Sequence, residues 1–152
     1  MTQGTPDYWR QLVSHVVLNR ELGIEFASLA TDGVILRLRH SSAVTEGPDD
    51  DCVHTAAIAA MVDAALGFSV HWAMPDDRSL ATLNIRVDHL ARPRPRSDVL
   101  CHAVCHKVEP HVAFTTGKIY HADAAQPFAL AVGTIVFITA DSWITRLEGT
   151  TP

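Results

Sequence analysis

The sequence predicts a single α+β domain in which one long apolar helix lies against a curved antiparallel sheet of five to six strands. The run "CVHTAAIAAMVDAALGFSVHW" (Cys52–Trp72) is almost wholly apolar and has the length of a buried helix. A strand pair around a turn signal precedes this run, and a series of alternating segments follows it. We expect one domain over residues 1–152, with its core at about 22–140.

The first part of the chain predicts a packing helix followed by a hairpin. The apolar positions of Asp7–Gly23 fall near one side of a helix, and Gly23 is a natural end for it. Asp32 and Gly33 then form a turn signal between two extended runs. The second run alternates two sets of side chains, which are Val34, Leu36 and Leu38 against Ile35, Arg37 and Arg39. The polar segment Ser41–Asp51 is predicted to be a loop.

The second half of the chain predicts a meander of strands after a loop at Ala73–Ser79. Extended segments lie at Leu80–Leu90, Asp98–Lys107, His111–Asp123 and Pro127–Asp141. Pro93 and Pro95 break the pattern between the first two segments. We expect the tail from Asp141 onward to be a loosely attached end.

The long helix raises the alternative of a membrane span, because about 20 apolar residues suit a bilayer. Asp63 at its centre would cost about 2.5–3.5 kcal/mol on insertion scales, so a buried helix is the better interpretation. At 1.5 Å per residue the helix is about 30 Å long. A helix that is apolar almost all round has to be covered on more than one side, so we expect a partner subunit to complete its cover.

Composition and charge limit the classes of function. The chain has 152 residues, 47% hydrophobic and 19% charged, with a formal net charge of -5. The negative charge argues against a nucleic-acid binder, while the local run "RPRPR" (Arg92–Arg96) is basic enough to hold the phosphates of a small ligand. An odd number of cysteines, three, favours reduced thiols in the cytoplasm, and Met1–Trp9 shows no signal-peptide pattern.

Residues Val53–Gly67, "VHTAAIAAMVDAALG", resemble the "HGG…D" helix of the hotdog-fold thioesterases of the phenylacetic-acid-degradation type. In that family an acid lies nine positions after the histidine, and here 63 minus 54 is also nine. The segments "TLNIRVDHLARPRPRSDVLCHAVCHK" and "PFALAVGTIVF" resemble later strands of the family. The resemblance covers about Leu22 to Ile138 and implies the hotdog fold, in which the sheet wraps the central helix.

The resemblance implies an acyl-CoA thioesterase that works as a homodimer or as a dimer of dimers, with coenzyme A as part of its substrate and no separate cofactor. Backbone N–H groups at the helix start of one subunit bind the thioester carbonyl, and an acid on the partner's helix attacks or activates water. Carried over by position, Thr55 and Ala56 supply the N–H groups, Asp63 is the acid and His54 opens the helix. No metal, nucleic acid or membrane is expected as a partner.

Helix geometry supports that division of labour independently. Thr55 and Asp63 are eight residues apart (63 minus 55), or about 12 Å along one helix. They cannot both touch one carbonyl from the same helix, so a shared site needs two helices related by a two-fold axis. The unpaired N–H groups of a first helical turn lie at its positive end, where an oxyanion is stabilised.

Each candidate residue has a second interpretation. Asp63 could be an acid on an exposed stripe of the helix, and His54 is more simply a residue that orients the start of the helix than a base. The motif reads His-Thr-Ala in place of His-Gly-Gly, which leaves less room for an acyl group and keeps open a non-catalytic acyl-CoA sensor or accessory subunit. The hydratase branch of the fold is disfavoured because its Asn-Pro element is absent.

Two further clusters complete the candidates. Arg92, Arg94 and Arg96 either form a solvated turn or bind coenzyme A phosphates, and Arg86 is a weaker candidate for that role. "CHAVCHK" invites a metal interpretation, but Cys101 and Cys105 on one strand would lie about 13 Å apart, too far to hold one ion.

Overall fold

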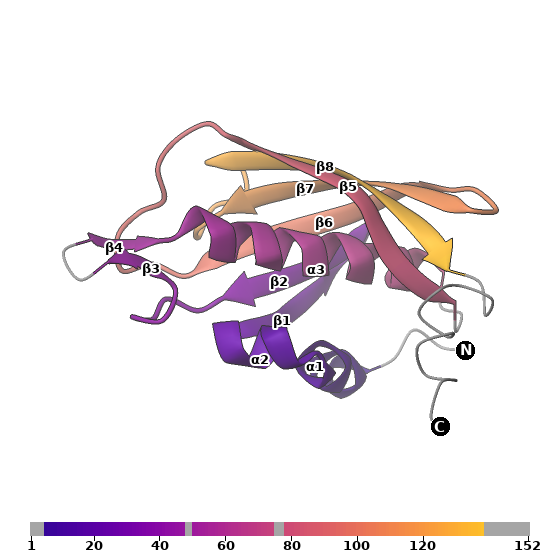
Figure 1. The fold of residues 1–152 in the computed structure, drawn as a ribbon, viewed down its shortest axis with the longest axis horizontal. Coiled ribbons are helices and arrows are strands. Elements are labelled where there is room, and N and C mark those ends of the chain that lie inside the picture. The colour runs from indigo at the N-terminus through magenta and orange to yellow at the C-terminus, as the bar shows by residue number, and fades with distance from the viewer. Residues whose placement is uncertain (1–4, 48–49, 75–77, 139–152) are drawn as a thin grey trace, which may run out of the picture.

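A six-stranded antiparallel sheet curls round one long helix in the computed structural model, which describes residues 5–47, 50–74 and 78–138 (Figure 1). The strand order is β1-β2-β6-β7-β8-β5, and β3 and β4 form a separate pair. The elements are α1 (Pro6–His15), α2 (Val17–Leu22), β1 (Ile24–Ala30), β2 (Gly33–Leu38), β3 (Thr45–Gly47), β4 (Asp50–Val53), α3 (Thr55–Ala73), β5 (Ser79–His89), β6 (Val99–Val108), β7 (Val112–Tyr120) and β8 (Ala129–Ile138). This confirms the predicted α+β hotdog fold.

The N-terminal helix differs from the prediction because it is two helices. The chain is extended at Val16, between α1 and α2, and α2 ends at Gly23 in the left-handed conformation (φ 71°) that favours glycine. The buried Asn19 side chain donates a hydrogen bond of 2.9 Å to the Val13 carbonyl. That bond satisfies an acceptor left unpaired where α1 ends, which stabilises the break.

The prediction of a loop over Ser41–Asp51 is wrong in its second half. Thr45 pairs with Val53 and Gly47 pairs with Asp50, so β3 and β4 form a short hairpin directly before α3. Its polar sequence hid the strand pattern, although Val44 and Val53 are both buried in the core. The predicted tail from Asp141 lies outside the described residues.

The core lies between one face of α3 and the concave side of the sheet. The buried residues of α3 recur at helical spacing and are Ala57, Ile58, Met61, Val62, Ala65, Leu66, Ser69 and Val70. Gly133 lets Leu66 approach the sheet, since a Cβ built there would lie 2.6 Å from one Leu66 methyl carbon, whereas a Cβ at Gly117 would make an ordinary contact of 3.6 Å with the other. The sheet is therefore shaped to accept this face of the helix.

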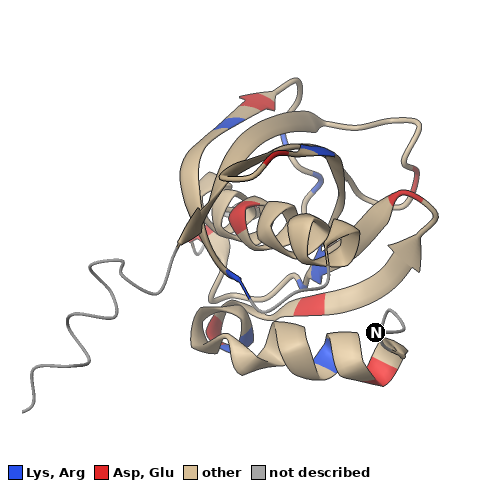
Figure 2. Ribbon diagram, turned by 90° about the vertical axis from the view of Figure 1, so that its right-hand side faces the viewer, with Lys and Arg blue, Asp and Glu red and all other residues tan. Residues whose placement is uncertain are grey.

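By length and composition alone, α3 could span a membrane, with a mean hydropathy of 1.4 over its most apolar window. A core helix has the same properties, and the sheet covers the buried face of α3. Figure 2 shows the sheet curling round this helix, on which the single acidic band is Asp63.

The order of the strands explains one long connection. β5 is an edge strand paired only with β8 in the described sheet, while β6, the next strand in sequence, pairs with β2 and β7. The segment between them, residues 90–98, has to cross three strand spacings, or about 14 Å. It passes the end of the molecule where β4 leads into α3 (Figure 1).

Candidate active site

The first candidate feature is the start of α3. His54 is the N-cap residue, and its Nδ1 accepts a hydrogen bond of 3.0 Å from the Ala56 N–H. The Ala57 and Ile58 N–H groups donate to the His54 carbonyl. Among the described residues nothing accepts from the Thr55 N–H, which therefore points its dipole outward at the positive end of the helix.

The hydrogen bonds of His54 define its contacts and its tautomer. Because Nδ1 accepts, the ring proton sits on Nε2, which lies 3.8 Å from a carboxylate oxygen of Glu46 on β3. This geometry agrees with the interpretation of His54 as a residue that orients the helix start. It also revises the assignment of Ala56, because its N–H is engaged by the His54 ring and only the Thr55 N–H is left of the two expected donors.

Asp63 lies two turns further along α3, on the exposed side of the helix next to the edge strand β5. Its side chain is exposed, whereas the sequence places it in the middle of an apolar run that reads as buried. One carboxylate oxygen accepts a hydrogen bond of 2.6 Å from the Thr82 hydroxyl on β5. The other oxygen accepts no hydrogen bond from any described residue, so it can meet a water or a substrate atom.

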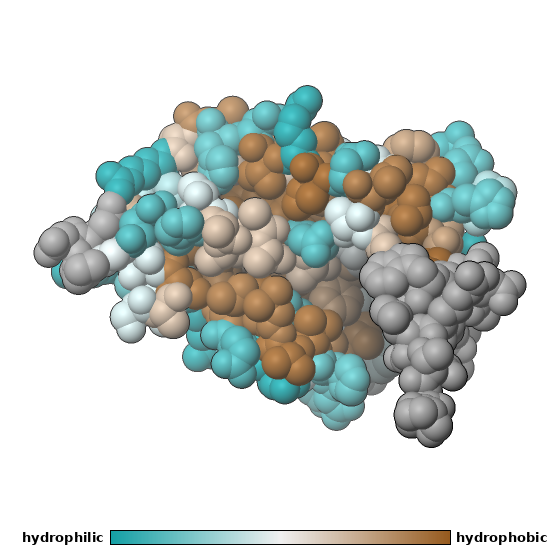
Figure 3. All heavy atoms as spheres, in the orientation of Figure 1, coloured by the Kyte–Doolittle hydropathy of each residue, from teal (hydrophilic) through white to brown (hydrophobic). Residues whose placement is uncertain are grey.

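An apolar groove with a volume of about 290 Å³ runs beside Asp63. Its walls come from the break between α1 and α2, the outer face of α3 and the start of β5, and its lining residues include Val16, Leu18, Ala64, Phe68 and Leu80. Figure 3 shows apolar side chains over much of this face. Among the described residues that line the groove, Asp63 is the only charged one, as suits an acyl chain or ring.

The structure does not bring Asp63 and the Thr55 N–H together within one chain. Both lie on the single element α3, eight residues (63 minus 55) apart. The adjacent strand β5 is a long free edge of the described sheet, and Leu83 in its middle is 64% exposed. Such an edge is a template for pairing with a second strand.

The arginines of the crossing segment separate into two groups. Arg92 and Arg94 line a cavity of about 260 Å³ together with His121 and Phe128. Arg96 instead bonds to Asp51 on β4, with its Nε 2.8 Å from a carboxylate oxygen. Arg86 lies outside the cavity and is paired with Asp88 on the same strand at 2.9 Å.

The segment that carries these arginines, which we call the arginine loop (residues 90–98), is fixed at several points. The Leu90 and Ala91 N–H groups donate to the Phe128 carbonyl, and the Arg96 N–H donates to the Asp51 carbonyl. Arg96 has a φ of 53°, in the left-handed region that costs a non-glycine residue about 1 kcal/mol or more. Strain of this kind persists where surrounding contacts over-determine the backbone, and it clusters at functional sites.

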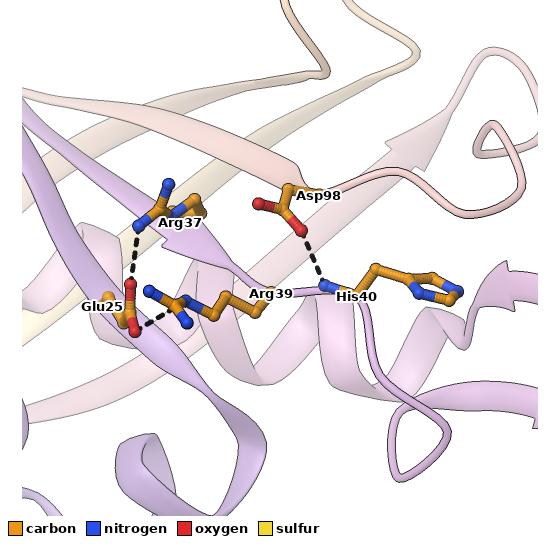
Figure 4. A network of polar contacts seen from close by, with 5 residues as sticks. All are labelled: Glu25, Arg37, Arg39, His40 and Asp98. Carbon is orange, nitrogen blue, oxygen red and sulfur yellow. Dashed lines mark hydrogen bonds and ion pairs between the residues drawn. The ribbon is translucent and has the colours of Figure 1, made fainter.

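Figure 4 shows how the end of the arginine loop meets β2. The Asp98 carboxylate accepts a hydrogen bond of 2.8 Å from the His40 N–H, at the point where β2 has ended. Beside it, Glu25 accepts from both Arg37 and Arg39 at 2.8 Å. Burial alone would raise the pKa of Glu25, but hydrogen bonds and attraction from the two arginines outweigh it, so the pKa lies below its ordinary value.

The cysteines do not form a reactive site. Cys101 points into the core, where burial raises the pKa of its thiol to about 12, and burial also raises the pKa of the Cys105 thiol. Among residues 5–47, 50–74 and 78–138, no group of three His, Cys, Asp or Glu side chains is placed to hold a metal ion.

Sequence reasoning missed two residues of the site. Thr82 contacts Asp63 from a strand that has no polar signature beyond its alternation. His121, directly after β7, contacts the arginine loop through both ring nitrogens. A histidine at the end of a predicted strand was a visible signal, but its partner loop lies more than 20 residues away in sequence, so only the fold reveals the contact.

Comparisons with known proteins agree with this fold. The family model of the thioesterase superfamily matches residues 51–127. A structurally characterised protein from Pseudomonas aeruginosa is 32% identical, with a TM-score of 0.77 over 87% of this chain and 98% of that one. The chain belongs to the thioesterase superfamily. No curated protein sequence matches it significantly.

More distant structures share the fold. A thioesterase from Haemophilus influenzae is 16% identical, with a TM-score of 0.79 over 92% of this chain and 94% of that one. A mutant form of the phenylacetic acid degradation protein PaaI from Thermus thermophilus is also 16% identical, with a TM-score of 0.67 over 80% of this chain and 99% of that one. The resemblance to this branch of hotdog proteins is thereby confirmed at the level of the fold.

Proposed function

We propose that this protein hydrolyses acyl-CoA thioesters to a free carboxylic acid and coenzyme A, as a homodimer with two sites shared between subunits. The observation that carries the proposal is Asp63, the only acidic residue on α3, which lies exposed beside an apolar groove with one oxygen held by Thr82 and one open. A carboxylate in that position is suited to act on a thioester carbon whose acyl group fills the groove.

The free edge of β5 supports the proposed dimer. If two β5 strands pair antiparallel about a two-fold axis, the two α3 helices run antiparallel on the same side of a continuous sheet. The small residues of the outer face, Ala56, Ala60 and Ala64, permit a close approach. Asp63 of one chain then meets the helix start of the other, where the Thr55 N–H is directed. We extend the proposal to a dimer of dimers as the larger assembly.

The chemistry balances with the groups of this site. Asp63 takes a proton from water as the oxygen attacks the thioester carbon, and the Thr55 N–H of the partner subunit stabilises the resulting oxyanion. When the carbon–sulfur bond breaks, the coenzyme A thiolate recovers the proton from Asp63. The arginine loop provides the anchor for the coenzyme A phosphates, chiefly through Arg92 and Arg94, which share one cavity. Cys52, Cys101 and Cys105 form no disulfide with one another, as suits the reducing cytoplasm, which we propose as the compartment.

The first test measures thiol release from short, medium, long and aromatic acyl-CoA esters. Asp63→Asn is expected to lower kcat by about 10²–10⁴-fold, because the amide cannot take a proton. Its stability is expected to stay within about 0.5 kcal/mol of the wild type, since Asp63 is exposed. Full activity in this variant would rule out the assignment.

A second variant tests the shared site. Thr55→Pro removes the N–H donor, and it suits the first position of a helix after an extended His54 (ψ 138°). Both single variants are expected to be inactive, whereas a random mixture of the two chains regains about one quarter of the wild-type rate, since half of the dimers are mixed and each holds one intact site. A mixture that stays inactive would contradict a site shared between subunits.

One observation favours a second candidate function, a non-catalytic acyl-CoA sensor or accessory subunit. The Ala56 N–H is already bonded to the His54 ring, which leaves one oxyanion donor where two were expected. One donor is worth about 10²–10³ in kcat in a hydrolase of this chemistry. Calorimetry that shows tight binding of coenzyme A together with no thiol release from any ester would favour this function.

A further inference from the structure

His121, directly after β7, binds the arginine loop through both of its ring nitrogens. Its Nε2 lies 2.9 Å from the Arg94 backbone nitrogen, and its Nδ1 lies 2.8 Å from the Asp98 carbonyl oxygen. The ring also stacks on Phe128, with 4.7 Å between centroids. His121 thus holds the arginine loop at both sides of its Arg96 bend.

These contacts admit one form of the imidazole. A backbone N–H can only donate and a carbonyl oxygen can only accept, so Nε2 carries the lone pair and Nδ1 carries the proton. Protonation would add a second hydrogen at Nε2, directed at the Arg94 N–H. Two donors at 2.9 Å repel each other, so the bond to Arg94 is lost while the bond to Asp98 can remain.

Charged groups of both signs line the cavity that His121 borders. Arg92 and Arg94 line the same cavity as His121, and Asp123 lines it from the turn that follows β7. The Asp98 carboxylate is bonded to the His40 N–H, away from the ring. The effect of protonation on the loop therefore comes from the new hydrogen at Nε2, which faces the Arg94 N–H at 2.9 Å between nitrogens.

We propose that His121 is a positioning residue for coenzyme A binding, which as a neutral imidazole holds Arg92 and Arg94 in place and as an imidazolium releases them. This inference rests on the proposed role of the arginine loop in binding phosphates. Histidine side chains change charge between about pH 5 and 8, so the bond between His121 and the Arg94 N–H is lost within a range that cells reach. The affinity for coenzyme A falls as the pH falls, and KM changes while kcat, which depends on Asp63, does not.

The test uses coenzyme A itself in titration calorimetry at several values between about pH 5.5 and 8. The monoester phosphate of coenzyme A also titrates near pH 6, so each variant is compared with the wild type at the same pH. His121→Gln keeps an amide oxygen that can accept from Arg94 and does not titrate. It is expected to match the wild type at high pH and to bind about fivefold more tightly than the wild type at low pH.

Two further variants complete the design. His121→Ala removes both bonds and is expected to weaken coenzyme A binding about fivefold at high pH. At low pH the variant and the wild type are expected to bind coenzyme A equally. His106→Gln changes an exposed histidine on β6 that bonds to Thr116, and it is expected to keep the wild-type profile. The ¹⁵N shifts of the His121 ring are expected to report a proton on Nδ1 at neutral pH and on both nitrogens in acid.

The outcomes separate this inference from the proposed function. If His121→Gln has the same pH profile as the wild type, or if the ring carries its proton on Nε2 at neutral pH, the positioning role is overturned while coenzyme A binding stands. If no form of the protein binds coenzyme A at any pH, the proposed role of the arginine loop fails. The ¹⁵N shifts of the ring then still show whether neutral His121 carries its proton on Nδ1, as its bonds to Arg94 and Asp98 require.

Discussion

The two faces of α3 have opposite surroundings although they share one backbone. The inner face lies on the sheet, and side chains such as Ile58, Met61 and Leu66 are fully buried there. The outer face carries small residues and one carboxylate, and within the described chain it borders a groove instead of a second layer. The difference shows that the helix is apolar all round for two reasons, since one face stabilises the fold and the other suits an apolar ligand or partner.

The largest expected effect separates the faces by stability. Leu66→Ala removes a fully buried side chain and leaves a space next to Gly117 and Gly133, so the free energy of unfolding is expected to fall by about 2–5 kcal/mol. Leu18→Ala removes the same atoms from an exposed wall of the groove and is expected to change it by less than about 1 kcal/mol. Urea unfolding at a fixed protein concentration measures both. Equal losses would show that the groove wall is as well packed as the core.

A smaller effect separates the faces by activity. Thr82→Val keeps the shape of the side chain but removes the hydroxyl that bonds to Asp63, so kcat is expected to fall about tenfold as the carboxylate loses its fixed orientation. Thr82→Ser retains a hydroxyl and is expected to retain most of the activity. Steady-state kinetics on the best ester measures both variants. A Val variant as active as the Ser variant would remove Thr82 from the site.

The smallest effect contrasts two glycines. A Cβ at Gly67, on the groove side, would meet no atom within 4 Å, so Gly67→Ala is expected to stabilise the protein by about 0.5–1 kcal/mol through helix propensity. A Cβ at Gly133, on the sheet side, would lie 2.6 Å from Leu66, so Gly133→Ala is expected to destabilise it by about 1–3 kcal/mol. Thermal unfolding gives the two signs. A loss of stability at Gly67 would show that another chain fills the groove there.

The sequence predicted the strands of the six-stranded sheet well because each of them has a strong local pattern. Val34, Leu36 and Leu38 alternate along β2 as expected, and all three are buried. It failed where a tertiary contact decides the structure. The break at Val16 depends on Asn19 capping α1, and the β3–β4 hairpin depends on two buried valines in a polar segment. Neither contact leaves a periodic pattern of apolar residues in the sequence, so pattern reasoning could not predict it.

The candidate site follows the same division. The apolar run identified the helix, and the resemblance, in which nine positions separate His54 from Asp63, identified its acid, because both are local properties of the chain. The packing of β5 against α3 decides the bond between Asp63 and Thr82. The rotamer of His54 decides that its ring accepts from the Ala56 N–H. The separation of Arg96 from Arg92 and Arg94 likewise depends on Asp51, which approaches only after β4 has formed.

By itself the sequence determined the α+β class, the order of the elements and the identity of the helix that carries the acid, because hydrophobic period and turn chemistry act over a few residues. Only the tertiary structure decided which side of that helix is open and which loop His121 holds. Such facts depend on strand order, here on β5 lying at the edge while β6 lies inside, and strand order is set by contacts between residues far apart in the chain.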